Sequence, residues 1–116
     1  PSYAIAISND GSRLALGGRE RPGNVFMISN FPSEDFERIR RIGHSGDARF
    51  VAFIDGGRRL VSGGEDGRVF LGRPDATQPI LTMFESNRAI RGLAISPDGR
   101  SIAATDGFRV FLATAP

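Results

Sequence analysis

His44 is the only histidine of the chain, and its side chain is the one whose ordinary pKa suits general acid–base chemistry near neutral pH. A serine hydrolase would also need a nucleophile on an exposed turn, commonly within a Gly-x-Ser-x-Gly motif. The stretch Gly43-His44-Ser45-Gly46-Asp47 fails at the last position of that motif. The sequence therefore favours a structural or loop role for His44 over catalysis, and no catalytic residue is predicted.

A metal or cofactor site is not expected, because the chain has no cysteine and only one histidine to offer as ligands. Asp10, Asp98 and Asp106 each precede a glycine, where an aspartate favours a turn by accepting hydrogen bonds from nearby backbone. The glycine-rich segment 62–67 could suggest a phosphate cradle, but the chain has no lysine for a P-loop and no helix is predicted after it. A turn between strands explains this segment better.

The basic residues are all arginine, fifteen in number, against thirteen acidic residues. The net charge is only +2, so the sequence pI of about 10.3 overstates how basic the chain is. The densest basic run contains Arg38, Arg40 and Arg41, which follow Glu37 and are predicted to line an outer strand, where charges discourage edge-to-edge aggregation. Phosphate contacts by these arginines are the alternative interpretation.

The composition is that of a folded domain, with 40% hydrophobic and 24% charged residues in 116. No apolar run approaches the roughly 20 residues that cross a bilayer, and no signal-peptide pattern is present. The absence of cysteine excludes a disulfide framework. The compartment is not determined by these features, and the cytoplasm is favoured.

Two blocks of sequence recur three times in the same order. The first spans residues 7–15, 53–61 and 95–103, at offsets of 46 and 42 residues. The second is Asn24-Val25-Phe26-Met27, followed by Arg68-Val69-Phe70-Leu71 and Arg109-Val110-Phe111-Leu112, at offsets of 44 and 41 residues. A period of this length is typical of repeat architectures, in which each repeat is one supersecondary unit.

Each repeat is predicted to consist of short strands, because turn residues separate segments of about five to seven residues rich in Val, Ile, Phe and Ala. Most of the nine Phe residues fall on these segments and are predicted to be core. A short helix capped by Ser33 is the alternative for Ser33–Gly43. The predicted strands are Tyr3–Ser8, Arg13–Gly17, Asn24–Ser29, Phe36–Ile42, Arg49–Ile54, Leu60–Gly63, Arg68–Gly72, Ile80–Phe84, Ile90–Ser96, Ser101–Thr105 and Phe108–Thr114.

Four short antiparallel strands per repeat, with Asp-Gly in the first turn and glycines in the second, resemble the WD-repeat β-propeller family. The resemblance implies an all-β fold of four-stranded antiparallel blades. It also implies a hydrogen-bonded network of His, Ser, Asp and Trp within a blade, of which His44, Ser62 and Asp66 match three positions. The Trp position holds Gly72, and its equivalents are Ile28 and Ala113.

The repeats divide the chain into three expected blades, at about 3–43, 44–86 and 87–116, the last without its outer strand. Closed propellers use about four to eight blades, and three would leave two apolar blade faces unpaired. The chain is therefore expected to be part of a larger propeller, with its remaining blades supplied by the same longer chain or by other copies.

The resemblance implies a non-catalytic scaffold that binds a protein partner, and the repeats indicate where. Tyr3, Arg49 and Arg91 occupy one equivalent position at the start of each innermost strand, on the face expected beside the central channel. Tyr and Arg are enriched at interface hot spots, so we expect this face to bind an acidic protein segment. A nucleic-acid-binding propeller and, less favoured, a propeller enzyme are the alternatives. The turns on the same face add Arg19, Glu20, Arg21 and Glu65.

Overall fold

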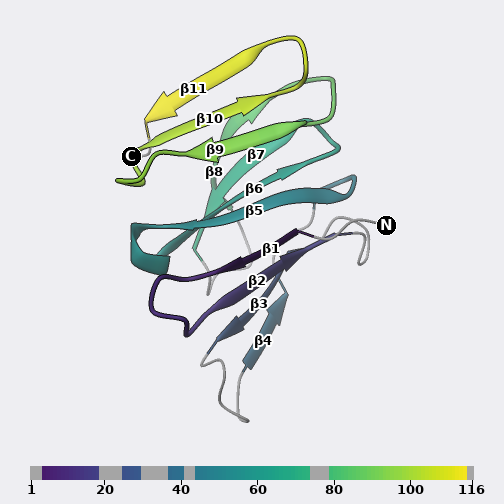
Figure 1. Ribbon diagram of the computed structural model, residues 1–116. Coiled ribbons are helices and arrows are strands. Elements are labelled where there is room, and N and C mark those ends of the chain that lie inside the picture. Colours follow the sequence, from purple (N-terminus) through teal and green to yellow (C-terminus); the bar gives the residue numbers. More distant parts are fainter. Residues whose placement is uncertain (1–3, 19–24, 30–36, 41–43, 74–78, 115–116) are drawn as a thin grey trace.

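The computed structural model describes residues 4–18, 25–29, 37–40, 44–73 and 79–114, and within them the chain is almost entirely β-structure (Figure 1). The predicted all-β fold is confirmed. One short 3-10 turn, η1 (Asp55–Gly57), interrupts the strands. The strands are β1 (Ala4–Ile7), β2 (Leu14–Gly17), β3 (Val25–Ser29), β4 (Glu37–Arg40), β5 (Ala48–Ile54), β6 (Arg59–Gly64), β7 (Arg68–Gly72), β8 (Pro79–Glu85), β9 (Gly92–Ile95), β10 (Ser101–Thr105) and β11 (Val110–Thr114).

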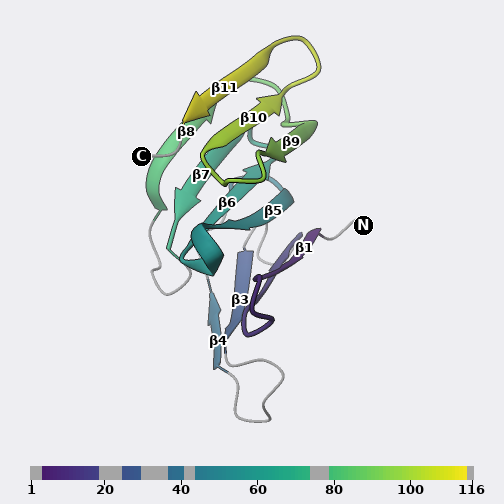
Figure 2. The same ribbon diagram turned by 60° about the vertical axis from the view of Figure 1, so that its left-hand side comes forward.

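The strands form three antiparallel sheets in chain order. Sheet 1 is β1-β2-β3-β4, sheet 2 is β5-β6-β7-β8 and sheet 3 is β9-β10-β11. The sheets stack on one another, and their first strands β1, β5 and β9 lie side by side (Figure 1). Figure 2 shows the outer strands β4 and β8 on the opposite side from these first strands. This is the arrangement of consecutive propeller blades, with the first strands on the channel side.

The turn between the first two strands is built in the same way in sheets 1 and 3. Asp10 Oδ1 accepts a hydrogen bond from the Ser12 N–H at 2.9 Å, and Asp98 Oδ1 accepts one from the Arg100 N–H at 3.0 Å. Hydrogen bonds from Ser12 and then Ser8 hold the pKa of Asp10 at about 2. Both carboxylates therefore serve their own turns.

The corresponding turn of sheet 2 has a different conformation, although its sequence aligns without gaps to the turns of sheets 1 and 3. Residues 55–57 form η1, in which Asp55 adopts a φ of 54° and its carboxylate pairs with the Arg59 guanidinium at 2.7 Å. The repeat alignment predicted a turn between the strands here, but not its 3-10 form. In the Ser33–Gly43 window, the residues that the structure describes form strand β4 and not a helix.

Apolar side chains fill the space between neighbouring sheets. Between sheets 1 and 2 the buried residues are Ala15, Val25, Ala48 and Leu60. Phe84 and Phe111 stack across sheets 2 and 3 with ring centroids 5.3 Å apart. The buried residues of that second layer are Ile54, Val61, Val69, Leu71, Ile90, Ile102 and Ala104.

A glycine pair at the end of a second strand lets the next sheet approach closely. The Ala48 N–H donates to the Gly18 carbonyl at 3.2 Å, and the Ile90 N–H donates to the Gly64 carbonyl at 3.0 Å. A Cβ on Gly17 would lie 3.2 Å from the Ala48 Cβ, and one on Gly63 would lie 3.2 Å from Ile90 Cγ2. The same contact thus joins sheet 1 to sheet 2 and sheet 2 to sheet 3.

Both ends of the stack expose apolar side chains among the described residues. Val69 and Leu71 of β7 are fully buried by sheet 3, whereas their repeat equivalents Val110 and Leu112 of β11 are 78% and 74% exposed. At the other end, Ile5 and Ile7 of β1 are exposed. Faces of this kind normally mark an interaction surface.

We expect the isolated chain to bind a hydrophobic dye through these faces. Replacing Val110 and Leu112 together by serine should lower dye fluorescence and keep the strand signal in circular dichroism, because neither side chain is packed. The matched Val69→Ser, at the equivalent buried position, should instead destabilise the fold. A wild-type chain that stays monomeric in light scattering and binds no dye would contradict this account.

Candidate functional site

The only histidine lies in a buried network at the start of sheet 2. His44 precedes β5, Ser62 is on β6, and Asp66 is in the turn between β6 and β7. His44 Nε2 is 2.9 Å from Ser62 Oγ, and His44 Nδ1 is 2.9 Å from Asp66 Oδ1. Asp66 also accepts the N–H groups of Ser45 and Arg68. The structure therefore brings together all three residues that the WD-repeat resemblance marked for the network.

Burial sets the charge state of this network. Loss of hydration holds the pKa of His44 below its ordinary value of 6.5, so the imidazole is neutral at neutral pH. Burial works to raise the pKa of Asp66, but hydrogen bonds from the His44 ring and from the backbone of Arg68 and Ser45 outweigh it and leave that pKa lowered. Because a carboxylate only accepts, Nδ1 carries the proton and Nε2 accepts the Ser62 hydroxyl.

The order Ser62–His44–Asp66 is also the hydrogen-bond order of a serine-hydrolase triad. Catalysis would require a substrate carbonyl to reach Ser62 Oγ. Ser62 is only 8% exposed and lies inside β6, and His44 is 2% exposed. The geometry therefore orients side chains within the sheet and gives the Ser62 hydroxyl no access to a substrate.

The histidine ring contacts a glycine and a phenylalanine of the same sheet. A Cβ on Gly64 would lie 2.6 Å from His44 Nδ1, so the ring packs directly on the backbone there. The ring also contacts Phe70, with centroids 4.7 Å apart. Phe70 pairs with Ser62 across β6 and β7 and supplies an aromatic contact although Gly72 stands at the Trp position. Comparison with the family motif missed Phe70, because the motif places its aromatic residue only at the Trp position.

Sheet 3 carries a smaller version of the network, which the sequence analysis missed. The Ser86 hydroxyl donates to Asp106 Oδ2 at 2.7 Å, and Asp106 Oδ1 accepts the N–H groups of Phe108 and Arg109 at 2.9 and 2.8 Å. These hydrogen bonds, led by the one from Ser86, lower the pKa of the Asp106 carboxyl. Ser86 follows His44 by 42 residues, the offset of the first sequence block, so the repeat alignment contained the signal.

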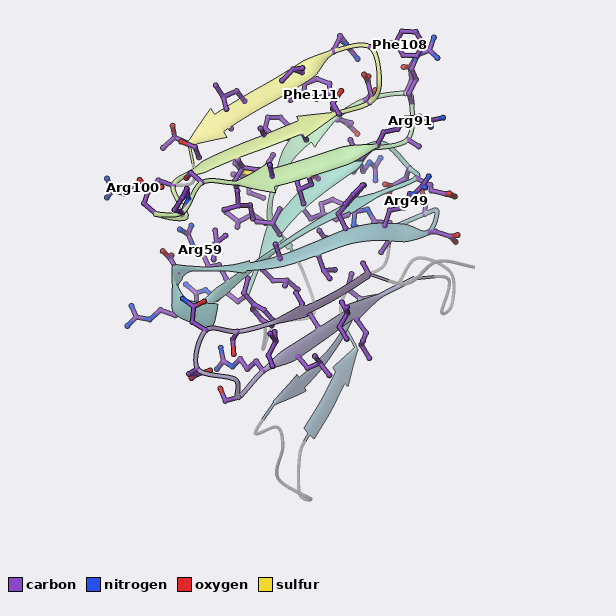
Figure 3. All side chains as sticks on the ribbon, in the orientation of Figure 1. Arg49, Arg59, Arg91, Arg100, Phe108 and Phe111 are labelled. Carbon is purple, nitrogen blue, oxygen red and sulfur yellow. The ribbon has the colours of Figure 1, made fainter. Side chains whose placement is uncertain are left out.

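Three of the predicted partner-binding residues lie at one end of the sheets: Arg49, Glu65 and Arg91. Figure 3 shows Arg49 and Arg91 at this end, together with Phe108, while Arg59 and Arg100 lie at the opposite end. We call the surface formed by Arg49, Glu65, Arg88, Arg91 and Phe108 the Arg49 face. The other predicted residues of this face, Tyr3, Arg19, Glu20 and Arg21, lie outside the described residues.

The charges of the Arg49 face are only partly neutralised. Arg49 Nη1 lies 3.7 Å from Glu65 Oε2, and both side chains are 43% exposed. A separation of this size gives a weak ion pair and leaves guanidinium donors unused. Arg91 is exposed and lies against Gly107, where a Cβ would be 3.2 Å from Arg91 Cδ.

The basic run on the outer strand is separate from this face. Arg38 and Arg40 lie on β4, the last strand of sheet 1, as predicted for an edge, and Arg41 lies outside the described residues. Among the side chains that the structure describes, no group of three His, Asp or Glu residues is arranged to hold a metal ion. In the same part of the chain, no helix is long and apolar enough to span a membrane.

The stacked antiparallel sheets, two of four strands and one of three, and the buried His–Ser–Asp network define a repeat protein of the propeller class. Residues 36–71 match the WD40 family model, described as "WD domain, G-beta repeat". The chain thus carries a WD repeat, and the resemblance seen in its sequence is confirmed.

Several similar proteins come from plants. The B-type cell cycle switch protein ccs52A of Medicago truncatula is 29% identical over 88% of this chain, and Protein FIZZY-RELATED 2 of Arabidopsis thaliana is 32% identical over 88%. Protein FIZZY-RELATED 1 of Arabidopsis thaliana is 31% identical over the same share. The chain spans about a fifth of the length of these curated relatives, 20 to 21% of each.

The buried network should make folding sensitive to acid. Because the folded-state pKa of His44 is below 6.5, its contribution to stability is present above pH 6.5 and is lost as the pH falls. The lowered aspartate pKa values add a second loss below about pH 4. We expect His44→Gln to abolish the first phase and keep the second in urea unfolding measured from pH 7.5 to 3. An unchanged first phase in this variant would contradict the assignment.

Asp66→Ala should cost about 2 kcal/mol at pH 7.5, because it leaves the buried His44 Nδ1–H without its acceptor. Asp98→Ala, in an exposed turn, should cost less and serves as the matched control in the same urea unfolding measurement.

Gly67 couples the networks of sheets 2 and 3. Its φ is 81°, its carbonyl accepts the Ser86 N–H at 2.8 Å, and a Cβ there would clash with the Ser86 carbonyl oxygen. Gly11 has a similar φ of 77°, and no atom of the described residues lies within 4 Å of its Cβ position. We expect Gly11→Ala to cost about 1–2 kcal/mol in urea unfolding from backbone strain alone. Gly67→Ala should cost about 1–3 kcal/mol more through the clash, and equal losses would show that the contact is unimportant.

Proposed function

We propose that this chain is part of a non-catalytic interaction scaffold and that the Arg49 face binds an acidic segment of a protein partner. The observation that carries the proposal is the repeated arginine at the start of the innermost strands. Arg49 and Arg91 are both exposed, stand at equivalent positions of β5 and sheet 3, and lie at the same end of the molecule (Figure 3). The WD repeat supports a protein partner, and a relative named as a cell cycle switch protein supports a regulatory setting.

The chemistry of the face suits carboxylates. Arginine presents a planar fork of donors that matches a carboxylate, and a partly exposed guanidinium needs little desolvation to bind one. Arg91 has no acidic partner within 4 Å among the described residues, and the Glu65 pair of Arg49 is long enough for an incoming carboxylate to replace it. The domain division at about 3–43, 44–86 and 87–116 is part of the same proposal. It places one of the equivalent positions Tyr3, Arg49 and Arg91 in each blade.

Two other functions are less well supported. An enzyme would need a reachable nucleophile, and Ser62 and His44 are buried. A nucleic-acid-binding propeller would need a continuous positive surface, but Arg59 and Arg100 lie at the opposite end of the sheets from Arg49 (Figure 3). Along the chain, Arg59, Arg68 and Arg109 are paired with acidic residues.

Charge reversal on the Arg49 face should abolish binding of an acidic probe. We expect Arg49→Glu plus Arg91→Glu to remove binding of a fluorescein-labelled peptide of alternating Asp and Leu, measured by fluorescence anisotropy, without changing the circular dichroism spectrum. Arg58→Glu plus Arg100→Glu, two exposed residues of the turns that precede β6 and β10, is the matched control and should leave binding intact.

Two outcomes would overturn the assignment. Loss of binding on Arg38→Glu plus Arg41→Glu, with Arg49 and Arg91 dispensable, would move the site to the outer edge of sheet 1. Tighter binding of a DNA duplex, with affinity falling steeply with the logarithm of salt concentration, would favour the nucleic-acid alternative.

A further inference from the structure

Phe108 is a large aromatic side chain in an unusual place. It lies in the turn between β10 and β11, on the Arg49 face, and is 74% exposed (Figure 3). In the equivalent turn of sheet 2, Asp66 and Gly67 lead directly to Arg68, whereas in sheet 3 Phe108 is inserted between Gly107 and Arg109. The inserted residue has no counterpart in the turn before β7, so the core packing of a blade does not explain it.

One arginine contacts this phenylalanine, and a second lies against the residue before it. The Arg88 guanidinium carbon lies 4.0 Å from the centre of the Phe108 ring, in a cation–π contact. Arg91 lies against Gly107, the residue before Phe108. Both arginines are exposed and have no acidic partner within 4 Å in the described part of the chain. The nearby Arg109 differs, because its guanidinium lies 3.6 Å from the Asp106 carboxylate.

The base of this cluster is rigid. Buried Asp106 accepts the Phe108 N–H and the Ser86 hydroxyl, and Ser86 Oγ in turn accepts the Arg88 N–H at 3.1 Å. The backbone of Ser86 and Arg88 rests on Gly67. The backbone of Phe108 and Arg88 is thus held in a hydrogen-bonded frame, which lowers the cost of ordering the backbone when a partner binds.

We propose that Phe108, Arg88 and Arg91 form an anchor site for a partner segment in which an apolar side chain lies next to a carboxylate. The ring offers an apolar contact, the Arg88 guanidinium offers donors beside it, and Arg91 adds a second guanidinium from its place against Gly107. This inference rests on the proposed function and specifies the kind of acidic segment that the face selects.

A protein segment fits this cluster better than a single-stranded nucleic acid does. Binding of successive bases uses several aromatic platforms along a basic groove. Phe108 is the one aromatic side chain among the exposed large hydrophobic residues of the described chain, and Arg88 already covers one side of its ring.

The test uses peptides of about ten residues and fluorescence anisotropy with the full chain. The probes are alternating Leu and Asp, alternating Ser and Asp, and alternating Leu and Ser. We expect the Leu/Asp peptide to bind about tenfold more tightly than either of the others. Phe108→Ala should remove this preference over the Ser/Asp peptide, and Arg88→Gln plus Arg91→Gln should remove the preference over the Leu/Ser peptide.

Leu112→Ala is the matched control, because Leu112 is as exposed as Phe108 but lies on the outer face of sheet 3. It should leave binding of the Leu/Asp peptide unchanged. Removing an exposed ring creates no cavity, and urea unfolding of Phe108→Ala checks that the fold is retained.

Each contrary result has a distinct meaning. An unchanged peptide preference in Phe108→Ala, with binding still abolished by charge reversal at Arg49 and Arg91, would overturn the anchor and leave the proposed function standing. Equal weakening by Leu112→Ala would assign the peptide to the outer face of sheet 3 and would also overturn it. Tighter binding of a single-stranded oligonucleotide that depends on Phe108 would replace it with a nucleic-acid platform. No binding of any Asp-containing peptide would refute the proposed function itself.

Discussion

The close approach of each sheet to the next is the constraint on which the rest of this structure depends. A backbone N–H at the start of one sheet reaches a glycine carbonyl of the preceding sheet, at Ala48 and Gly18 and again at Ile90 and Gly64. Glycine at positions 17 and 63 makes room for this approach, because a Cβ at either position would lie only 3.2 Å from a side chain of the next sheet. The backbone bond sets the position of each sheet, and the apolar layers between sheets supply the stabilising burial.

The polar networks depend on the same approach. Gly64 lies under the His44 ring and also accepts the Ile90 N–H, so one residue serves both the network of sheet 2 and its junction with sheet 3. Burial that keeps His44 neutral also makes its hydrogen bonds to Ser62 and Asp66 strong and directional. The Ser62–His44–Asp66 order resembles a catalytic triad, but the surrounding sheet gives the Ser62 hydroxyl no access to a substrate. The network therefore orients the turn between β6 and β7.

The Arg49 face is a consequence of this framework. The turns held by Asp66 and Asp106 emerge at one end of the sheets and carry Glu65 and Phe108, while the starts of β5 and sheet 3 carry Arg49 and Arg91 (Figure 3). Side chains that are far apart in the sequence thus share one surface, with a frame of buried carboxylates beneath it. Rigid support of this kind favours a surface that binds a partner without reorganising.

Much of the architecture could be predicted from the sequence, because its repeats reflect the local preferences of residues for strands and turns. Alternation of apolar residues, Asp-Gly turns and recurring Val-Phe blocks specify strands and turns over a few residues, and all eleven strands are found near their predicted places. The match of His44, Ser62 and Asp66 to one repeat was also visible, because each follows a fixed position in that repeat. Only the tertiary structure decided the rest. The contact of Phe70 with the His44 ring and the pairing of Arg88 with Phe108 depend on how strands and turns of one sheet meet in space, and local sequence patterns carry no information on those distances.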